Sequence, residues 1–420
     1  MYRAPRGTAD ILPQEQHYWR YVERIAENLA QRYGFQKIDT PVFESTGLFT
    51  RTTGEATDIV DKEMYTFLDR GKDEISLRPE GTAPVCRAYL ENGMQALPQP
   101  VRLYYFCPIF RYDRPQAGRY RQHHQFGIEI LGESDVAVDT EVIELAWRFF
   151  EELGLQGQTL HLNSIGDQQC RPKYLQTLVE YYRPHYSKLC ADCKGRIEHN
   201  PLRLLDCKKN DCSTLSENAP NSIDYLCPPC QNHWFGLIQY LDELEIPYQI
   251  NKSLVRGLDY YTRTVFEIQP LEAGAQAVLC GGGRYDGLIE QLGGKPTPGI
   301  GFATGFERII LNLKRQNIQI QAADPALVLL AHLGTNAQRE CIKIASLLRK
   351  NNVRTVVAPA GRSLKGQMRY GSSSGATFAL ILGDDELSKG MIVLRNLQLG
   401  EQKAIPLNEI VQYLPDILCK

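Results

Sequence analysis

The stretch Leu254-Val-Arg-Gly-Leu-Asp-Tyr-Tyr-Thr262 places one arginine shortly before two adjacent tyrosines, in a run that otherwise has the pattern of a strand edge. The guanidinium of Arg256 can hold a negatively charged group through two parallel hydrogen bonds. The hydroxyls of Tyr260 and Tyr261 can donate and accept hydrogen bonds in a small polar pocket. The stretch therefore predicts a polar binding pocket, with an ordinary surface strand as the alternative.

The composition is that of a folded, water-soluble chain. Of the 420 residues, 43% are hydrophobic and 23% are charged, which excludes a disordered protein and indicates two or three domains. No apolar run approaches the roughly 18 residues that a membrane span needs. Residues 1–7 lack the apolar core of a signal peptide, so we expect a cytoplasmic protein without a membrane partner.

Charge and cysteine content restrict the partners. The net charge of −2 counts mildly against nucleic acid, but a local basic stripe is sufficient for binding, and the chain has one at Arg111, Arg114, Arg119 and Arg121. Twelve cysteines in a chain without an export signal indicate reduced thiols or bound metal, not disulfides.

Hydrophobic spacing predicts an α+β fold. After Pro13, apolar residues recur at the helical positions Tyr18, Val22, Ile25, Leu29 and Tyr33, and Gly34 follows as a C-terminal cap. The next predicted strand, 35–43, is broken at Thr40-Pro41; because proline lacks an N–H donor, we expect this strand at an edge or interface. Strands at 101–110 and 127–131 flank the arginine-rich stretch, which predicts a long-looped hairpin in an antiparallel sheet.

Two changes along the chain, one in composition and one in the pattern of strands and helices, predict the domain boundaries. Residues 168–232 are rich in cysteine, lysine, asparagine and proline, which marks a module inserted into a first domain of residues 1–325. From Ala326 onward, strands and helices alternate, which predicts a separate α/β domain of residues 326–420. The linker is expected at residues 319–325.

Three segments resemble, in order, the signature motifs of class II aminoacyl-tRNA synthetases: Gly34 to Phe43, Phe110 to Asp113 and Gly299 to Arg308. The resemblance implies that Pro41 packs at a homodimer interface. It assigns ATP binding to Arg111, Asp113, Arg119 and Arg308, with Asp113 replacing the family's usual glutamate. The spacing G-x-G-x-x-x-G at 299–305 differs from the dinucleotide fingerprint, and the chain contains no P-loop sequence.

Two further segments, 77–82 and 125–129, narrow the resemblance to histidyl-tRNA synthetase. In that family Glu80, Thr82 and Gln125 lie near the ammonium of histidine, and Glu129 faces the imidazole. An ionised carboxylate only accepts hydrogen bonds, so it suits a ring N–H. The implied histidine-binding residues are Glu80, Gly81, Thr82, Gln125, Glu129, Arg256, Tyr260 and Tyr261.

The resemblance also assigns the chemistry. Arg256 and Arg111 are the implied catalytic residues, which together stabilise charge on the α-phosphate while the histidine carboxylate attacks. Residues 277–288, with three consecutive glycines, resemble a second motif specific to the family, where backbone lies against substrate; a plain tight turn is the alternative. His123 stands where we expect phenylalanine, which predicts altered packing and not altered chemistry.

The inserted module carries six cysteines in three pairs. Cys190-x-x-Cys193 and Cys227-x-x-Cys230 have the spacing of a structural zinc site, and we take these four as candidate ligands. Reduced, metal-free thiols remain the alternative, and disulfides are a more distant one. Cys207 and Cys212 would be spare.

The sequence thus predicts a histidine–tRNA ligase that uses ATP with Mg²⁺. Histidine tRNA would be bound by a C-terminal anticodon-binding domain and, through its 5′ end, by Arg114 and Gln116. The first alternative is the non-catalytic regulatory subunit of ATP phosphoribosyltransferase, which resembles the catalytic domain only. The second is a class II synthetase for threonine, proline or glycine, which shares the C-terminal domain but not the 254–262 segment.

Overall fold

The computed structural model describes residues 2–53, 57, 59–116, 118–270, 278–320 and 326–418. The chain divides into two compact units, Met1–Ile320 and Gln321–Lys420, and each is described by itself. Most of the expected linker, residues 321–325, lies outside the described residues, as does Ala277 of the second family-specific motif.

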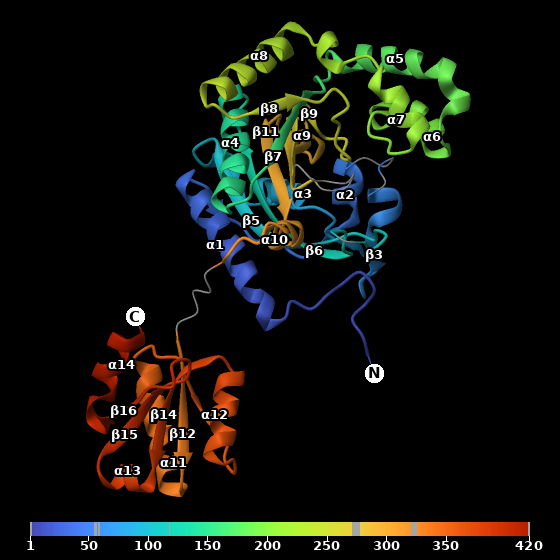
Figure 1. Ribbon diagram of the computed structural model, residues 1–420. Helices are drawn as coiled ribbons and strands as arrows, with labels where there is room; N and C mark the ends of the chain where they lie inside the picture. The colour runs from blue at the N-terminus through green and yellow to red at the C-terminus, as the bar shows by residue number, and fades with distance from the viewer. Residues whose placement is uncertain are drawn as a thin grey trace. The chain divides into compact units, whose positions relative to one another are not determined.

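The first unit is organised around an eight-stranded sheet in the order β1-β5-β6-β11-β10-β9-β7-β8 (Figure 1). Its strands are β1 (Gln36–Lys37), β5 (Val101–Phe110), β6 (Gln122–Leu131), β7 (Gln158–Ser164), β8 (Tyr248–Ile250), β9 (Thr262–Pro270), β10 (Cys280–Arg284) and β11 (Gly299–Gly305). The inner strands pair antiparallel, while β1 and β8 add parallel edges. The predicted antiparallel sheet, its long hairpin and the edge position of the first strand are confirmed.

One face of this sheet is covered by four helices, α1 (Gln16–Arg32), α4 (Val136–Glu152), α8 (Pro228–Glu243) and α10 (Phe306–Arg315). The apolar stripe of α1 packs there, and Gly34 adopts a φ of +76° just beyond the helix, as its predicted role as a cap requires. In β6, alternate residues Phe126, Ile128 and Ile130 point into this core. The intervening residues, Glu129 among them, therefore face the other side.

A buried ion network fixes these helices to the sheet. Arg284, at the end of β10, donates from Nε to the Asp139 carboxylate of α4 at 3.0 Å. The ring of His233 in α8 bonds the same carboxylate at 2.8 Å. Both Arg284 and Asp139 have fully buried side chains, so removing one partner would leave an uncompensated buried charge. The network holds the glycine-rich strand β10 in place beneath the opposite face.

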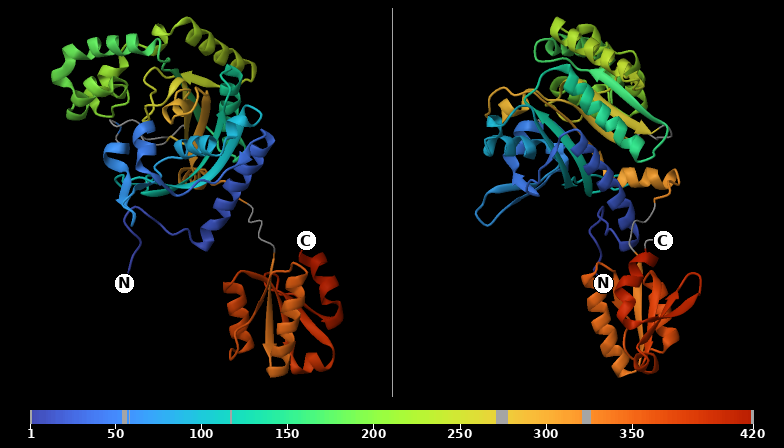
Figure 2. Two further views of the ribbon diagram at one scale, coloured as in Figure 1. Left: turned by 180° about the vertical axis from the view of Figure 1, so that it is seen from behind. Right: turned by 90° about the vertical axis from the view of Figure 1, so that its left-hand side faces the viewer.

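The opposite face carries smaller elements. A three-stranded sheet, β2-β4-β3, lies there with α2 and α3, and Figure 2 shows them on the side of the large sheet away from α4 and α8. Their bounds are β2 (Phe43–Ser45), α2 (Thr46–Thr53), β3 (Tyr65–Leu68), β4 (Glu74–Leu77), α3 (Thr82–Glu91) and α9 (Leu288–Gln291). The predicted insertion folds as three helices, α5 (Arg171–Tyr182), α6 (Ala191–His199) and α7 (Asn210–Glu217), packed into the core of this face.

The second unit has a five-stranded sheet in the order β13-β12-β14-β15-β16. Its elements are β12 (Leu327–Leu333), α11 (Thr335–Lys350), β13 (Thr355–Val357), α12 (Leu364–Ser373), β14 (Ala376–Gly383), α13 (Asp384–Ser388), β15 (Met391–Asn396), β16 (Gln402–Pro406) and α14 (Ile410–Leu418). The first three paired strands are parallel, as strand–helix alternation predicts, and β15 and β16 add an antiparallel edge. Among the described helices of the whole chain, none is long and apolar enough to cross a membrane.

Candidate active site

A cavity of about 450 Å³ opens over the face of the large sheet that carries Glu129. Its walls come from segments far apart in sequence: the N-terminus of α3, the loop between β5 and β6, the 254–262 stretch, and strands β10 and β11. Eleven predicted site residues line it: Glu80, Gly81, Thr82, Arg111, Asp113, Arg119, Gln125, Arg256, Tyr260, Tyr261 and Arg308. The fold therefore brings the predicted ATP residues and all the predicted histidine residues except Glu129 into the lining of one space.

Glycines make room for the side chains of Glu129 and Arg256 on this face of the sheet. Gly301 pairs in register with Glu129, and a Cβ at Gly301 would collide with the Glu129 carboxylate. A Cβ at Gly281 would likewise collide with the Arg256 guanidinium. These contacts explain why glycine recurs in β10 and β11: the sheet surface has to be flat where functional side chains lie across it.

Glu129 does not line the cavity itself: it is only 1% exposed and lies behind Thr82, Tyr105 and Tyr285, which do line it. Its carboxylate accepts hydrogen bonds from Thr82 Oγ1 at 2.7 Å, from the Tyr105 hydroxyl at 3.1 Å and from the Tyr285 hydroxyl. Burial raises the pKa of Glu129 to about 8, even though these donors act in the opposite direction. The site thus holds a carboxyl group in an unusually dry, hydroxyl-lined position.

Glu80 lies at the N-terminus of α3. Its two carboxylate oxygens accept from the backbone N–H groups of Thr82 at 2.6 Å and Ala83 at 2.8 Å. This arrangement places negative charge where the helix dipole favours it. Burial raises the pKa of Glu80, and the two N–H donors oppose the shift. The turn between Glu80 and Thr82 is thereby fixed beside Glu129.

Arg256 lies across Gly281 and is paired with Glu267, the residue that faces Gly281 in the β9–β10 register. Burial alone would lower the pKa of Arg256, but the Glu267 charge raises it above its ordinary value. The guanidinium also lies over the Tyr261 ring, with 5.8 Å between its carbon and the ring centroid. Arg256 is consequently a permanent cation held in a defined orientation.

Two polar atoms in this part of the cavity have unused hydrogen-bonding capacity. Within the described residues, Gln125 Oε1 and Arg256 Nε are buried and have no hydrogen-bond partner. Unpaired buried polar atoms cost free energy, so their presence in a cavity wall favours a ligand that satisfies them. The buried rings of Tyr260 and Tyr261, with centroids 4.8 Å apart, form the adjacent wall.

The other end of the cavity gathers cations. Arg111 is anchored by its Nε, which donates to the Pro79 carbonyl at 2.7 Å, and Arg308 donates to the carbonyls of Gly118 and Val278 at 2.9 and 2.7 Å. Burial, followed by the nearby charges of Arg119 and Arg111, lowers the pKa of Arg308. Three guanidinium groups held this close repel one another, which favours a polyanionic ligand between them.

His123 lies among these arginines, on the cavity wall. Burial, together with the charges of Arg111 and Arg308, lowers the pKa of His123 to about 3. The ring is therefore neutral near pH 7 and adds no charge to the cluster. The sequence predicted only that His123 alters packing; the structure also places its side chain in the cavity lining.

Sequence reasoning missed three residues of the site. Tyr105 and Tyr285 bond Glu129, and Glu267 pairs with Arg256. The rings of Tyr105 and Tyr285 are buried, so in sequence they have the pattern of ordinary core residues. The one available signal was the glycine pattern, because a Cβ at either Gly81 or Gly127 would strike Tyr105.

Arg114 and Gln116, predicted to contact tRNA, lie outside the cavity. Both are exposed on the loop between β5 and β6, and Gln116 forms an isolated bridge with Arg119. The loop therefore presents its tip outward while Arg111 and Arg119 face the cavity.

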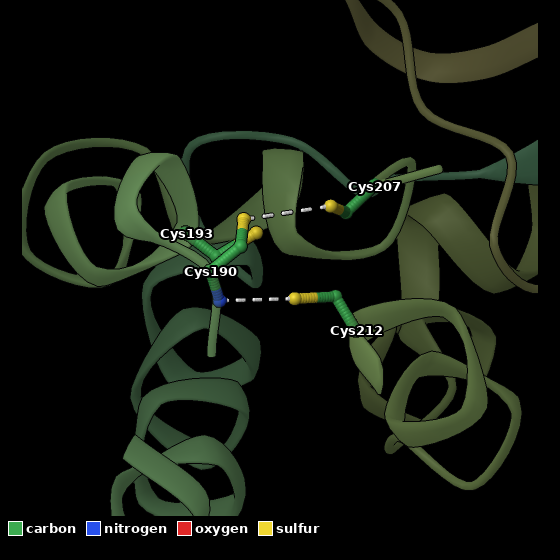
Figure 3. Close-up of side chains that lie close together, drawn as sticks. All are labelled: Cys190, Cys193, Cys207 and Cys212. Atoms are coloured by element: carbon green, nitrogen blue, oxygen red, sulfur yellow. Dashed lines mark hydrogen bonds between the residues drawn. The ribbon is translucent and has the colours of Figure 1, made fainter. Parts of the chain in front are cut away.

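The predicted set of four cysteine ligands is wrong in its grouping. Cys190 and Cys193 lie with Cys207 and Cys212, as Figure 3 shows. Cys227 and Cys230 lie instead with Asp167 and Cys170 in a second group. One C-x-x-C pair lies at the start of α6 and the other at the start of α8, in separate groups, and the cysteines taken as spare complete the first group.

The chain is similar to known proteins over its whole length. A profile of the family described as histidyl-tRNA synthetase matches residues 7–166 and 230–309, and one of the anticodon binding domain matches residues 327–417. The histidine–tRNA ligases of Dehalococcoides mccartyi and Desulforamulus reducens are 57% and 50% identical over 411 and 410 residues, 98% of each chain.

A solved structure agrees with these matches. That of apo S. aureus histidyl-tRNA synthetase has a TM-score of 0.83 at 39% identity, covering 98% of this chain and 99% of the other. The resemblance inferred from sequence motifs is confirmed: the chain belongs to the histidyl-tRNA synthetase family.

Proposed function

We propose that this protein activates histidine with ATP to histidyl-adenylate and then transfers the histidyl group to the 3′ end of histidine tRNA. The observation that carries the proposal is one cavity with the buried Glu129 carboxyl directly behind its lining residue Thr82 at one end and three crowded arginines at its other end. The first end suits an imidazole N–H, and the second suits a triphosphate.

At the amino-acid end, Glu129 accepts from the imidazole N–H, and Tyr260 and Tyr261 enclose the ring. Glu80, Thr82 and the unpaired Gln125 Oε1 receive the ammonium. This orientation directs the substrate carboxylate toward Arg256. Holding both reactants in this geometry removes much of the entropic barrier to attack.

At the nucleotide end, Arg111 and Arg256 bind the α-phosphate, and Arg308 and Arg119 bind the outer phosphates. A histidine carboxylate oxygen attacks the α-phosphorus, the bond to the bridging oxygen breaks, and pyrophosphate leaves. Charge builds on the non-bridging oxygens in this step, and fixed cations in a dry site stabilise it. Asp113 is already paired with Arg119, and Glu307 already accepts from the backbone N–H of His124, so both carboxylates are bonded within the site before a ligand binds. ATP would be bound with Mg²⁺, which neutralises part of its charge.

Neither alternative is favoured. A regulatory subunit would need no anticodon-binding domain, whereas residues 327–417 match one. A Bacillus halodurans structure described as an ATP phosphoribosyltransferase regulatory subunit/histidyl-tRNA synthetase shares the fold, with a TM-score of 0.65, but only 22% identity. Threonine, proline and glycine, the amino acids of the second alternative, have no side-chain N–H that would need the buried Glu129.

The deciding experiment is ATP–pyrophosphate exchange with each of the standard amino acids. We expect exchange with histidine alone, because a site that hydrogen-bonds a ring N–H rejects analogues lacking it by large factors. Threonine, proline and glycine are the informative controls. Exchange with one of them, or with none of the amino acids, would refute the proposal.

Arg114 and Gln116 are proposed to contact the 5′ end of the tRNA, because they are exposed beside the cavity and arginine suits guanine or phosphate. Arg114→Ala is expected to slow aminoacyl transfer while leaving pyrophosphate exchange unchanged. The mutation of a base contact costs about 1–3 kcal/mol. Exchange and charging should be measured side by side, with Arg70→Ala as a surface control. A parallel fall in both activities would assign Arg114 to ATP instead.

We also propose a homodimer acting in the cytoplasm. The segment after Pro41 supports the first point, because Val42 and Phe43 are 39% and 55% exposed, next to an edge strand. The cytoplasmic location is supported by the eleven described cysteines, all of which are free thiols.

A further inference from the structure

Four cysteines of the insertion converge from two short helices and the loop between them (Figure 3). Cys190 immediately precedes α6, and Cys193 lies in the first turn of that helix. Cys212 lies in the first turn of α7. Cys207 is on the loop that connects the helices. Cys193, Cys207 and Cys212 are buried, and Cys190 is partly exposed, so the group has one side open to solvent.

The spacing of the sulfurs is that of a four-coordinate site. All four Sγ atoms lie within 4.8 Å of one another, and Cys190 and Cys207 are 3.9 Å apart. Tetrahedral coordination with bonds of 2.3 Å places ligand sulfurs about 3.8 Å apart. The backbone N–H of Cys190 also points at Cys212 Sγ, 3.4 Å away, as a donor that favours an anionic sulfur.

We propose that Cys190, Cys193, Cys207 and Cys212 bind one zinc ion in a structural site. Four soft thiolates without an open position are the ligand set that tetrahedral zinc takes in such sites. The local fold supports this assignment, because α6 has nine residues and α7 has eight, and helices of that length are marginal without an added constraint.

The second group, with Cys227 and Cys230, is a weaker candidate. Its one carboxylate, Asp167, already accepts from the backbone N–H of Gln169 at 3.0 Å and pairs with Arg263 at 3.4 Å. Its charge is thus balanced without a metal.

The ion would fix a segment that reaches the active site. Between Cys193 and Cys207 the chain carries Asn200, whose Nδ2 donates to Asp259 Oδ1 at 2.7 Å, within the 254–262 stretch. It also carries Arg203, which lines the cavity. The zinc site therefore clamps both ends of a segment that supports one wall of the histidine pocket.

The primary test measures metal in the full-length protein, purified without chelators or a polyhistidine tag. Elemental analysis should find about one zinc per chain. Cys207→Ser should lose the ion to a chromophoric chelator at least about tenfold more readily, whereas Cys207→His, which keeps a zinc ligand, should retain it. Cys227→Ser, in the second group, is the matched control and should behave like the wild type.

A second measurement avoids dependence on variant folding. Wild-type protein reconstituted with Co²⁺ should show the absorption of a tetrahedral cobalt thiolate, with the four sulfurs protected from a thiol reagent. A wild-type chain that contains no zinc, takes up no Co²⁺ and has all thiols reactive would overturn the proposal. So would loss of the ion in Cys227→Ser with retention in Cys207→Ser.

Catalysis supplies a further readout, which rests on the proposed function. Metal removal should raise the KM for histidine in pyrophosphate exchange, and zinc should restore it. If metal removal left pyrophosphate exchange unchanged, only the proposed link between the zinc site and the histidine pocket would be refuted. The zinc site itself is tested by the metal analysis, which does not depend on activity.

Discussion

Replacing Arg256 by alanine is expected to reduce histidine-dependent pyrophosphate exchange by at least about two orders of magnitude, a loss of about 3 kcal/mol in transition-state stabilisation. The guanidinium is held over Gly281 and against Glu267, so its charge is fixed before the α-phosphate arrives. Steady-state exchange at saturating ATP and histidine measures the effect. Near-normal exchange by Arg256→Ala would remove this residue from the mechanism.

Two companion variants separate charge from structure. Arg256→Lys keeps the charge but loses the planar fork, so it should recover only part of the rate. Glu267→Gln removes the partner that orients Arg256 while leaving the cation, so its effect on kcat should be smaller than that of Arg256→Ala. Thermal unfolding of all three checks that a lost rate is not lost folding, because truncating one member of a buried pair is destabilising by itself.

Glu129→Ala is expected to raise the KM for histidine about 30- to 150-fold, since a hydrogen bond to a charged group contributes roughly 2–3 kcal/mol when its partner is left unpaired. The loss is compounded because the hydroxyls of Thr82, Tyr105 and Tyr285 also lose their acceptor. Calorimetric titration with histidine measures it directly.

The control for Glu129→Ala is Glu290→Ala, which removes an exposed acid elsewhere on the same unit. Discrimination against other amino acids should weaken in Glu129→Ala and remain intact in the control. Unchanged histidine affinity in Glu129→Ala would show that Glu129 does not bind the imidazole.

Much of the fold could be predicted from local sequence. The 101–110 strand was predicted to the residue, because its ends coincide with Pro100 and the arginine-rich loop. The helical stripe ending at Gly34 and the alternation after Ala326 were equally clear. These predictions rest on hydrophobic periodicity and on glycine and proline breaks, which depend only on neighbours along the chain.

What could not be predicted depends on contacts across the sheet. Tyr105 and Tyr285 reach Glu129 only because β5, β6 and the end of β10 are brought together by strand register. Cysteine spacing likewise gave pairs but not their grouping, which the path of α5 to α7 decides. The position of His123 in the arginine cluster could not be predicted for the same reason, because its neighbours Arg111 and Arg308 come from different elements.

The role proposed for the buried carboxyl of Glu129 would make histidine binding a proton-linked event. With a pKa of about 8 in the folded protein and about 4.3 in an unfolded chain, this group keeps a proton near pH 7 that unfolding releases. Its contribution to stability is therefore fully present below about pH 4 and is lost as pH rises through 8. In the proposed binding mode, histidine uses the ionised form as an acceptor, so binding is expected to release that proton. Mildly alkaline conditions thus weaken the free fold while favouring the occupied one, and the substrate itself becomes part of what holds the site together.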